Sequence, residues 1–292
     1  MNELRTLLIN AVQREINDEN VAIFFSGGTD SLTCLFCCLE LNIKPKLYTF
    51  HLEDYISEDV KTSKKVARYF GLDVQIVPIK KNKNRLVSDI KDLIKNYDIH
   101  NKLKLQILYP FPYVLENINE KFILTGLTAD TLYGTNYHTN MESSTEFNKL
   151  RKQAILMDEV DGYNALKKMV NNAEKKLVAP YRNQQVIDYF LKFSWNELNK
   201  PIQKQKSINA FNNYFEQQLV YRESSSLSIN SKIVDWHQTL LSSDRLTSEL
   251  FEIRKGANLA STFTTELYGK PTLFVKWYKV PNAIATIPDR RL

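Results

Sequence analysis

The most restrictive feature of the sequence is an alternation of short β-rich runs with amphipathic helical patterns. β-branched and aromatic residues concentrate in four runs, at residues 21–25, 46–50, 73–79 and 121–125. Helical patterns separate these runs, and the clearest one, at 57–71, has acidic residues in its first turn and Gly71 at its end. This alternation predicts an α/β fold with a parallel sheet and helices on both faces.

The second half of the chain has a different pattern. From about residue 139 the strand pattern fades, and we expect helices within 149–177 and 184–199. The exception is 269–281, where a turn signal and β-branched residues predict a late strand. We therefore expect an α/β core over residues 1–145 and a mainly helical region over residues 146–292 that packs on the core.

Composition and length restrict the class of protein. The 292 residues are 43% hydrophobic and 25% charged, which is typical of a globular chain with a substantial core. The first twenty residues predict an amphipathic helix rather than a signal peptide, and no apolar run is long enough to cross a membrane. The three cysteines all lie within residues 34–38, which favours a reducing compartment. We expect a cytoplasmic protein.

The chain is basic, with a net charge of +6 and a pI near 9.0. Its densest basic run, KKNKNR at 80–85, follows an expected strand and is more typical of a solvated loop than of a nucleic-acid footprint. Charge alone therefore favours neither a nucleotide nor a nucleic acid as the ligand.

The first expected strand is followed by a turn that is suited to an anion. The segment FFSGGTDSLTCL at 24–35 contains the residues Ser26, Gly27, Gly28, Thr29, Asp30 and Ser31 between the strand and a helix. Adjacent glycines let the backbone approach a ligand, and the helix N-terminus that follows attracts phosphate groups. An aspartate beside an anion implies an intervening divalent cation, so Asp30 predicts a Mg²⁺ ligand.

SGGTDS resembles the SGGxDS signature of the PP-loop ATP pyrophosphatases. Three further segments resemble, in order, parts of the synthetase domain of asparagine synthetase: 48–79, ILTGLTADTLYGTNY at 123–137 and APYRNQQVIDYFL at 179–191. NELNKPIQKQKSINAF at 196–211 is similar to the stretch that carries the essential lysine of that domain. The resemblance implies a nucleotide-binding core that uses ATP and Mg²⁺.

The resemblance also implies roles for single residues. Asp30 and Asp130 match the two carboxylates that bind Mg²⁺ with the pyrophosphate, and Phe24 and Leu52 match the positions that flank adenine. Gly126 matches a position near the ribose and α-phosphate. Lys206 best matches the lysine that neutralises the developing phosphate charge, with Lys204 as the alternative register.

Two departures from the family pattern concern the second half of the reaction. Leu127 stands where the family has a glutamate that is implicated in amide formation. The chain also begins directly with the synthetase-like part, so we expect no glutaminase domain, and ammonia would come free or from a separate subunit. Alternatively, the nucleophile is an amine of the substrate itself.

Three functions are compatible with these residues. The favoured one is an AMP-forming ligase that adenylates a small carboxylate or amino acid and transfers the acyl group to ammonia or an amine. The second is an enzyme that adenylates a base of tRNA or another nucleic acid, and the third is an ATP-binding regulatory module without ligase activity. No membrane partner is expected, and a homodimer is compatible with the sequence.

The cysteines allow two interpretations. Cys34, Cys37 and Cys38 have helical spacing that is compatible with thiol chemistry or metal binding. They lie, however, in the apolar segment LTCLFCCLEL, where a free cysteine behaves as a small hydrophobic residue. We expect all three thiols to lie in the core.

Overall fold

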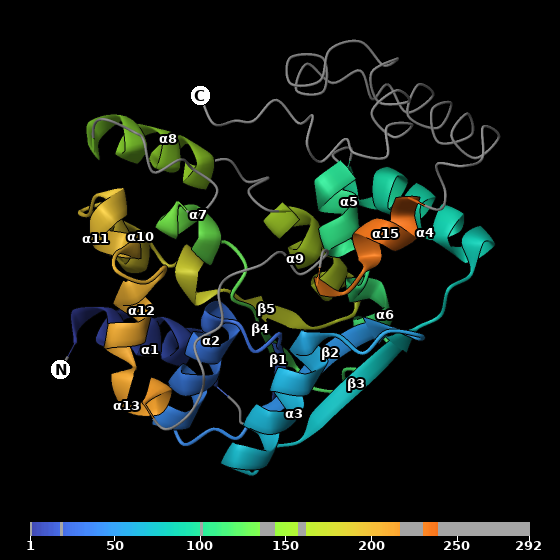
Figure 1. Ribbon diagram of the computed structural model, residues 1–292, viewed down its shortest axis with the longest axis horizontal. Helices are drawn as coiled ribbons and strands as arrows, with labels where there is room; N and C mark the ends of the chain where they lie inside the picture. The colour runs from blue at the N-terminus through green and yellow to red at the C-terminus, as the bar shows by residue number, and fades with distance from the viewer. Residues whose placement is uncertain are drawn as a thin grey trace.

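The computed structural model describes residues 2–17, 20–99, 102–134, 144–156, 162–216 and 230–238. They form a five-stranded sheet with helices on both faces (Figure 1). The strands are β1 (Val21–Phe24), β2 (Lys46–Leu52), β3 (Val74–Ile79), β4 (Phe122–Leu124) and β5 (Lys176–Val178). Their order is β3-β2-β1-β4-β5, and every neighbouring pair is parallel. The α/β fold class predicted from the sequence is confirmed.

The helices fall into two groups by the face of the sheet that they cover (Figure 1). One face is covered by α1 (Glu3–Glu15), α2 (Thr29–Glu40), α3 (Glu58–Phe70), α7 (Ala129–Tyr133), α8 (Ser144–Leu156), α10 (Gln184–Phe190), α11 (Trp195–Asn199), α12 (Gln205–Ala210) and α13 (Asn212–Phe215). The other is covered by α4 (Lys83–Tyr97), α5 (Lys102–Leu108), α6 (Phe111–Leu115), α9 (Tyr163–Asn172) and α15 (Ile233–Gln238). A short 3-10 helix, η2 (Pro180–Arg182), follows β5.

Side-chain alternation along the strands explains why both faces are apolar. In β1, Val21 and Ile23 belong to the cluster under α1 and α2, whereas Ala22 belongs to the cluster on the opposite face. In β4, Leu124 belongs to the cluster under α1 and α2, and Ile123 belongs to the cluster on the opposite face. Because successive side chains point to opposite faces, a strand that is buried on both faces has to be apolar along its whole length.

The order of the strands locates the carboxyl-end crevice of the sheet. The chain leaves β1 toward β2 and β3 on one side, and then returns to the other side of β1 to form β4. The loops after β1 and β4 are therefore neighbours at the carboxyl edge of the sheet, and they lead to α2 and α7 on the same face. The region where these two loops meet is called the crevice below. In open α/β sheets such a switch point is the usual place for a ligand.

The helical interpretation of the second half needed one correction. The expected helix at 149–177 is two helices, α8 and α9, followed by β5, which hydrogen-bonds to β4 and extends the sheet. A strand of three residues is too short for a recognisable alternation, and its register is supplied by the neighbouring strand. The strand expected at 269–281 lies outside the described residues, and the boundary near residue 145 stays a prediction.

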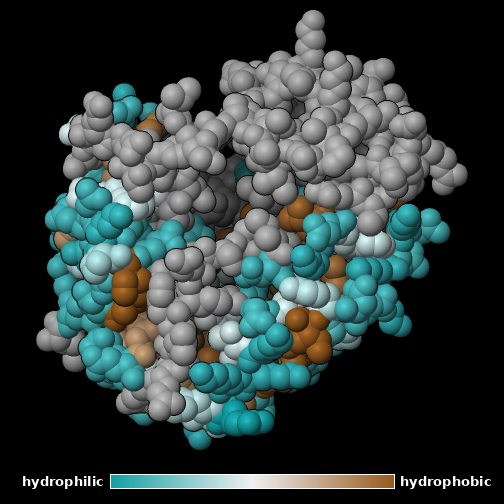
Figure 2. All heavy atoms as spheres, in the orientation of Figure 1, coloured by the Kyte–Doolittle hydropathy of each residue, from teal (hydrophilic) through white to brown (hydrophobic). Residues whose placement is uncertain are grey.

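The surface of the described residues is mainly hydrophilic on the face in Figure 2, where the hydrophobic residues lie in small separate groups. The exposed large hydrophobic residues are Ile56, Tyr69 and Ile202. No helix in the described ranges is both long and apolar enough to cross a membrane.

The three cysteines on α2 lie in the core, as the sequence predicted. Cys34, Cys37 and Cys38 are each 0% exposed and free of disulfide bonds. Burial raises the pKa of the Cys34 and Cys37 thiols well above the ordinary value, and it raises the pKa of Cys38 to about 12. The thiolate is the reactive form, so these cysteines are inert in the folded protein.

Thiol titration tests this packing. In the native protein at neutral pH we expect no reaction of the three cysteines with a chromogenic disulfide reagent, because the thiols are buried and protonated. All three should react after unfolding in guanidinium chloride. Rapid labelling of any one of them in the native protein would contradict the packing of α2 against the sheet.

Candidate active site

The loop between β1 and α2 is organised by its own hydroxyl groups. The Ser31 hydroxyl donates to the Gly28 carbonyl at 3.0 Å and lies 3.3 Å from the Ser26 hydroxyl, which accepts from the Gly28 N–H at 3.3 Å. Thr29 is buried, and its carbonyl accepts from Thr33 at 2.8 Å. These bonds fix the curvature of the loop without a ligand.

The N-terminus of α2 points its unpaired N–H groups into the crevice. The N-cap of α2 is Gly28, and no side chain in the described ranges accepts from the first N–H groups of this twelve-residue helix. Four N–H groups at a helix N-terminus lack a partner within the helix, and together with the helix dipole they favour a negatively charged group. The anion site at this turn stays a prediction.

Two glycines allow the loops to approach closely. Gly27 has a φ of +72°, and a Cβ atom there would lie 2.9 Å from the Thr62 Cβ atom of α3. Gly126, at the end of β4, packs against Asp30, and a Cβ atom would lie 2.7 Å from the Asp30 Cβ atom and 2.8 Å from its carbonyl carbon. A side chain at Gly126 would push the β4 loop away from Asp30.

A lysine joins the two predicted carboxylates. The Lys204 Nζ atom lies 2.6 Å from Asp30 Oδ2 and 2.7 Å from Asp130 Oδ1. The Lys204 side chain is 3% exposed, whereas the side chains of Asp30 and Asp130 are 19% and 44% exposed. The structure thus brings together residues from the β1 loop, the β4 loop and the start of α12.

Asp30, Asp130 and Lys204 form a charged triad, and each charge affects the pKa values of the other groups. Burial raises the pKa of Asp30 to about 6, and the ammonium group of Lys204 opposes that rise, while Asp130 adds to it. Burial by itself would lower the pKa of Lys204, but the two carboxylates outweigh burial and raise it above its ordinary value. Lys204 is therefore held as a cation at the crevice.

This geometry selects the alternative lysine of the sequence analysis. Lys206 does not reach the carboxylates, because its Nζ atom lies over the Phe193 ring at 3.8 Å from the ring centre. Lys204 precedes α12 in the left-handed conformation, with a φ of 63°, whereas Lys206 lies within the helix. The choice of Lys206 is corrected to Lys204, since the start of α12 decides which lysine faces the crevice.

The two residues expected to flank adenine differ in accessibility. Phe24 ends β1 and is partly buried, with its ring 4.7 Å from that of Phe111 in an edge-to-face contact. Leu52 ends β2 and is 1% exposed in the core. A ligand beside β2 would therefore meet the backbone of Leu52 rather than its side chain.

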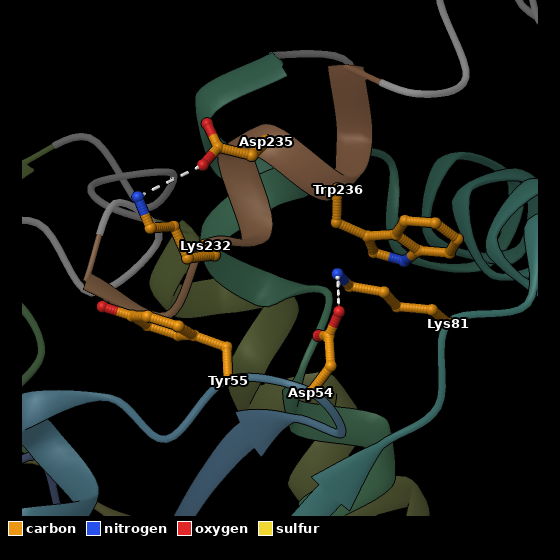
Figure 3. A pocket seen from close by; sticks show the side chains of 6 residues that line it. All are labelled: Asp54, Tyr55, Lys81, Lys232, Asp235 and Trp236. Carbon is orange, nitrogen blue, oxygen red and sulfur yellow. Dashed lines mark hydrogen bonds and ion pairs between the residues drawn. The ribbon is translucent and has the colours of Figure 1, made fainter.

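A pocket of about 280 Å³ lies beside Asp54 and Tyr55, in the segment that follows β2 (Figure 3). It is lined by Asp54, Tyr55, Lys81, Lys232, Asp235 and Trp236. Lys81 pairs with Asp54 at 2.6 Å, and Lys232 pairs with Asp235 at 3.5 Å. The two lysines and two aspartates balance each other, so the charged side chains that line this pocket give it no net charge.

The donors at the crevice fit a magnesium ion. Asp30 Oδ1 is buried without a hydrogen-bond partner, so one carboxylate oxygen is available to a cation. Asp130 supplies a second carboxylate across the same lysine. Magnesium is typically held by one or two protein carboxylates together with phosphate oxygens and water. The described residues contain no cluster of three or more His, Cys, Asp or Glu side chains that could hold a metal ion.

Comparisons with known proteins identify the family. The family model for asparagine synthase matches residues 3–247 of the chain. A comparison with curated proteins gave no match. The family match includes every residue of the triad and both glycines that bring the loops together.

Two solved structures are similar at low TM-score. One is a predicted subunit of tRNA methyltransferase from Methanocaldococcus jannaschii, with 15% identity over 59% of this chain and 73% of that chain, at a TM-score of 0.32. The other is the U34-tRNA thiolase NcsA from Methanococcus maripaludis with its 4Fe-4S cluster, with 14% identity over 88% of this chain and 77% of that chain, at a TM-score of 0.38. At these scores the similarity carries no functional argument.

Replacing the buried lysine tests the triad. We expect Lys204→Met to lower the free energy of unfolding by about 2–3 kcal/mol, because it leaves two carboxylates without a counter-charge, and Asp130 is only half-buried. Lys206→Met, the matched control, should cost less than about 1 kcal/mol. Urea denaturation of both variants measures the difference, and equal losses would contradict the assignment of Lys204.

The same pair of variants tests the cation site. In the absence of nucleotide, Lys204 lies between the carboxylates that a divalent cation would use, so lysine and metal compete. Lys204→Met should therefore bind Mn²⁺ more tightly than the unmodified protein does, and Lys206→Met should not. Titration of Mn²⁺ followed by electron paramagnetic resonance measures the free ion, and unchanged affinity in Lys204→Met would exclude this competition.

Proposed function

The chain belongs to the asparagine synthase family of PP-loop ATP pyrophosphatases, and we propose that it is an AMP-forming ligase. It activates a carboxylate substrate with ATP and transfers the acyl group to ammonia or an amine. The observation that carries the proposal is the convergence of Asp30, Asp130 and Lys204 at the N-terminus of α2. Two carboxylates beside a helix N-terminus that favours anions are suited to bind a magnesium ion together with a pyrophosphate group.

The proposed orientation of ATP follows from the edge of the sheet. The β- and γ-phosphates bind at the N–H groups of the first turn of α2, where the helix dipole is positive. The base lies toward the ends of β1 and β2, beside Phe24 and the backbone of Leu52. Gly126, which matches the family position near the ribose and α-phosphate, packs against Asp30 and so sets how closely the β4 loop approaches the β1 loop.

In the proposed reaction, a carboxylate oxygen of the substrate attacks the α-phosphorus and the bond to pyrophosphate breaks. Asp30 and Asp130 are the residues that would hold magnesium, and the ion would supply charge neutralisation on the pyrophosphate. Lys204 supplies positive charge as the leaving group forms. Phosphoryl chemistry of this kind depends mainly on positioning and electrostatic stabilisation by the protein.

The acceptor side is where this chain departs from its family. Leu127 occupies the position of the family glutamate, and it packs partly buried against the core beside β2 and β4. An apolar side chain there cannot take a proton from the nitrogen nucleophile. The amine or ammonia in the proposed second step therefore arrives unprotonated, or another group removes its proton.

Product analysis tests this proposal. With α-labelled ATP, Mg²⁺ and a panel of amino acids with ammonia, we expect AMP and pyrophosphate rather than ADP and phosphate. Asp30→Asn should lower the rate of AMP formation about 10²- to 10³-fold, because the isosteric amide holds a cation poorly. Asp89→Asn is the matched control, since Asp89 is also a half-buried carboxylate but bonds to Tyr113 on the opposite face of the sheet.

Different products would indicate different functions. Formation of ADP, or AMP formation that persists in Asp30→Asn, would contradict the ligase proposal. AMP formation that depends on added RNA and falls steeply with salt would favour the nucleic-acid-modifying alternative. ATP binding without turnover under every acceptor would favour the regulatory alternative.

A further inference from the structure

The side chain of Asn199 connects the two segments that carry Lys204 and Asp130. Its Nδ2 atom donates to the Tyr133 carbonyl at 2.8 Å and to the Trp195 carbonyl at 3.2 Å. Its Oδ1 atom accepts from the Lys204 backbone N–H at 3.3 Å. Asn199 is 3% exposed, so these bonds are shielded from water.

The backbone of Lys204 needs such a connection. Lys204 has a φ of 63°, a left-handed conformation that is uncommon for a residue with a long side chain. A conformation of this kind persists only where the surrounding structure fixes it. The Asn199 carboxamide fixes the Lys204 N–H and, through Tyr133, ties it to the end of α7, the helix that carries Asp130.

A second connection lies one turn further along α12. The Tyr133 hydroxyl lies 2.6 Å from the Ser207 hydroxyl and accepts from the Ser207 N–H at 2.8 Å. The Tyr181 hydroxyl lies 3.1 Å from the same Ser207 hydroxyl. Ser207 and Tyr181 are both 0% exposed. Tyr133 thus accepts from Asn199 through its backbone and from Ser207 through its side chain.

We propose that Asn199, assisted by Tyr133, is a positioning residue that holds Lys204 at the two carboxylates of the active site. Asn199 touches neither carboxylate and acts through the backbone of Lys204. This role rests on the proposed ligase function for its kinetic consequence, but the position of the Lys204 amine can be measured without any turnover.

Chemical labelling tests the position of the lysine. The Lys204 amine is buried and charged, so an acylating reagent should modify it far more slowly than exposed Lys200 in the same segment. In Asn199→Ala and in the volume-conserving Tyr133→Phe, the labelling rate of Lys204 should rise toward that of Lys200, as measured by peptide mass spectrometry. Unchanged protection in both variants would overturn the proposal.

The matched controls come from the opposite face of the sheet. Asn117 donates to the Tyr113 carbonyl four residues earlier at 2.9 Å, as Asn199 donates to Trp195, and the Tyr113 hydroxyl bonds to Asp89 and to Tyr109. Asn117→Ala and Tyr113→Phe therefore remove the same chemical groups at a distance from the triad. They should leave the labelling of Lys204 unchanged.

Kinetics separate positioning from a general loss of structure. In Asn199→Ala and Asn199→Asp, kcat for AMP formation should fall about 10- to 100-fold while KM for ATP changes little, because only the placement of Lys204 is altered. Asn199→Asp retains the acceptor for Lys204 but loses the donor to Tyr133. Wild-type kcat in both variants would overturn the proposal even where labelling increases. Absence of turnover in the unmodified protein would contradict the proposed function alone, and labelling would then decide the positioning role.

Discussion

The ion pairs of one buried lysine with two carboxylates are the interaction on which the rest of the site depends. Asp30 and Asp130 come from loops that follow different strands, and two partly buried carboxylates at this separation would repel each other without a counter-charge. Lys204 supplies that charge from a segment more than seventy residues further along the chain. The packing of α11 and α12 against α1, α2 and α7 is therefore coupled electrostatically to the geometry of the loops after β1 and β4.

The sheet order makes this convergence possible. Because β1 lies between β2 and β4, the loops after β1 and β4 lie side by side at the carboxyl edge of the sheet, which is the usual place for a ligand in an open α/β sheet. Gly126 then brings the β4 loop against Asp30, and Gly27 brings the β1 loop against α3. The β1 loop is thus packed closely on both sides, against the β4 loop and against α3, and this packing shapes the proposed phosphate site.

In the proposed site, the residues on the nucleotide side match the family pattern, whereas a residue on the acceptor side departs from it. Family membership extends over residues 3–247, and the carboxylates, the glycines and the lysine that the proposed function assigns to ATP occupy one connected cluster. Leu127, the residue after Gly126, is apolar at the position where the sequence resemblance implies a glutamate. In the proposed function, activation of the carboxylate is retained, while the choice of nucleophile and the removal of its proton belong to this chain.

The sequence by itself determined the elements that local pattern specifies. It located four strands and the two aspartates that the structure brings together at Lys204, because apolar periodicity, glycine turns and acids at strand ends are local signals. It missed β5, since three residues contain too little pattern, and it favoured Lys206 over Lys204. Only the tertiary structure decided the lysine and its connection through Asn199. The left-handed turn before α12 sets which side chain enters the crevice, and that turn is held by contacts between residues far apart in the sequence.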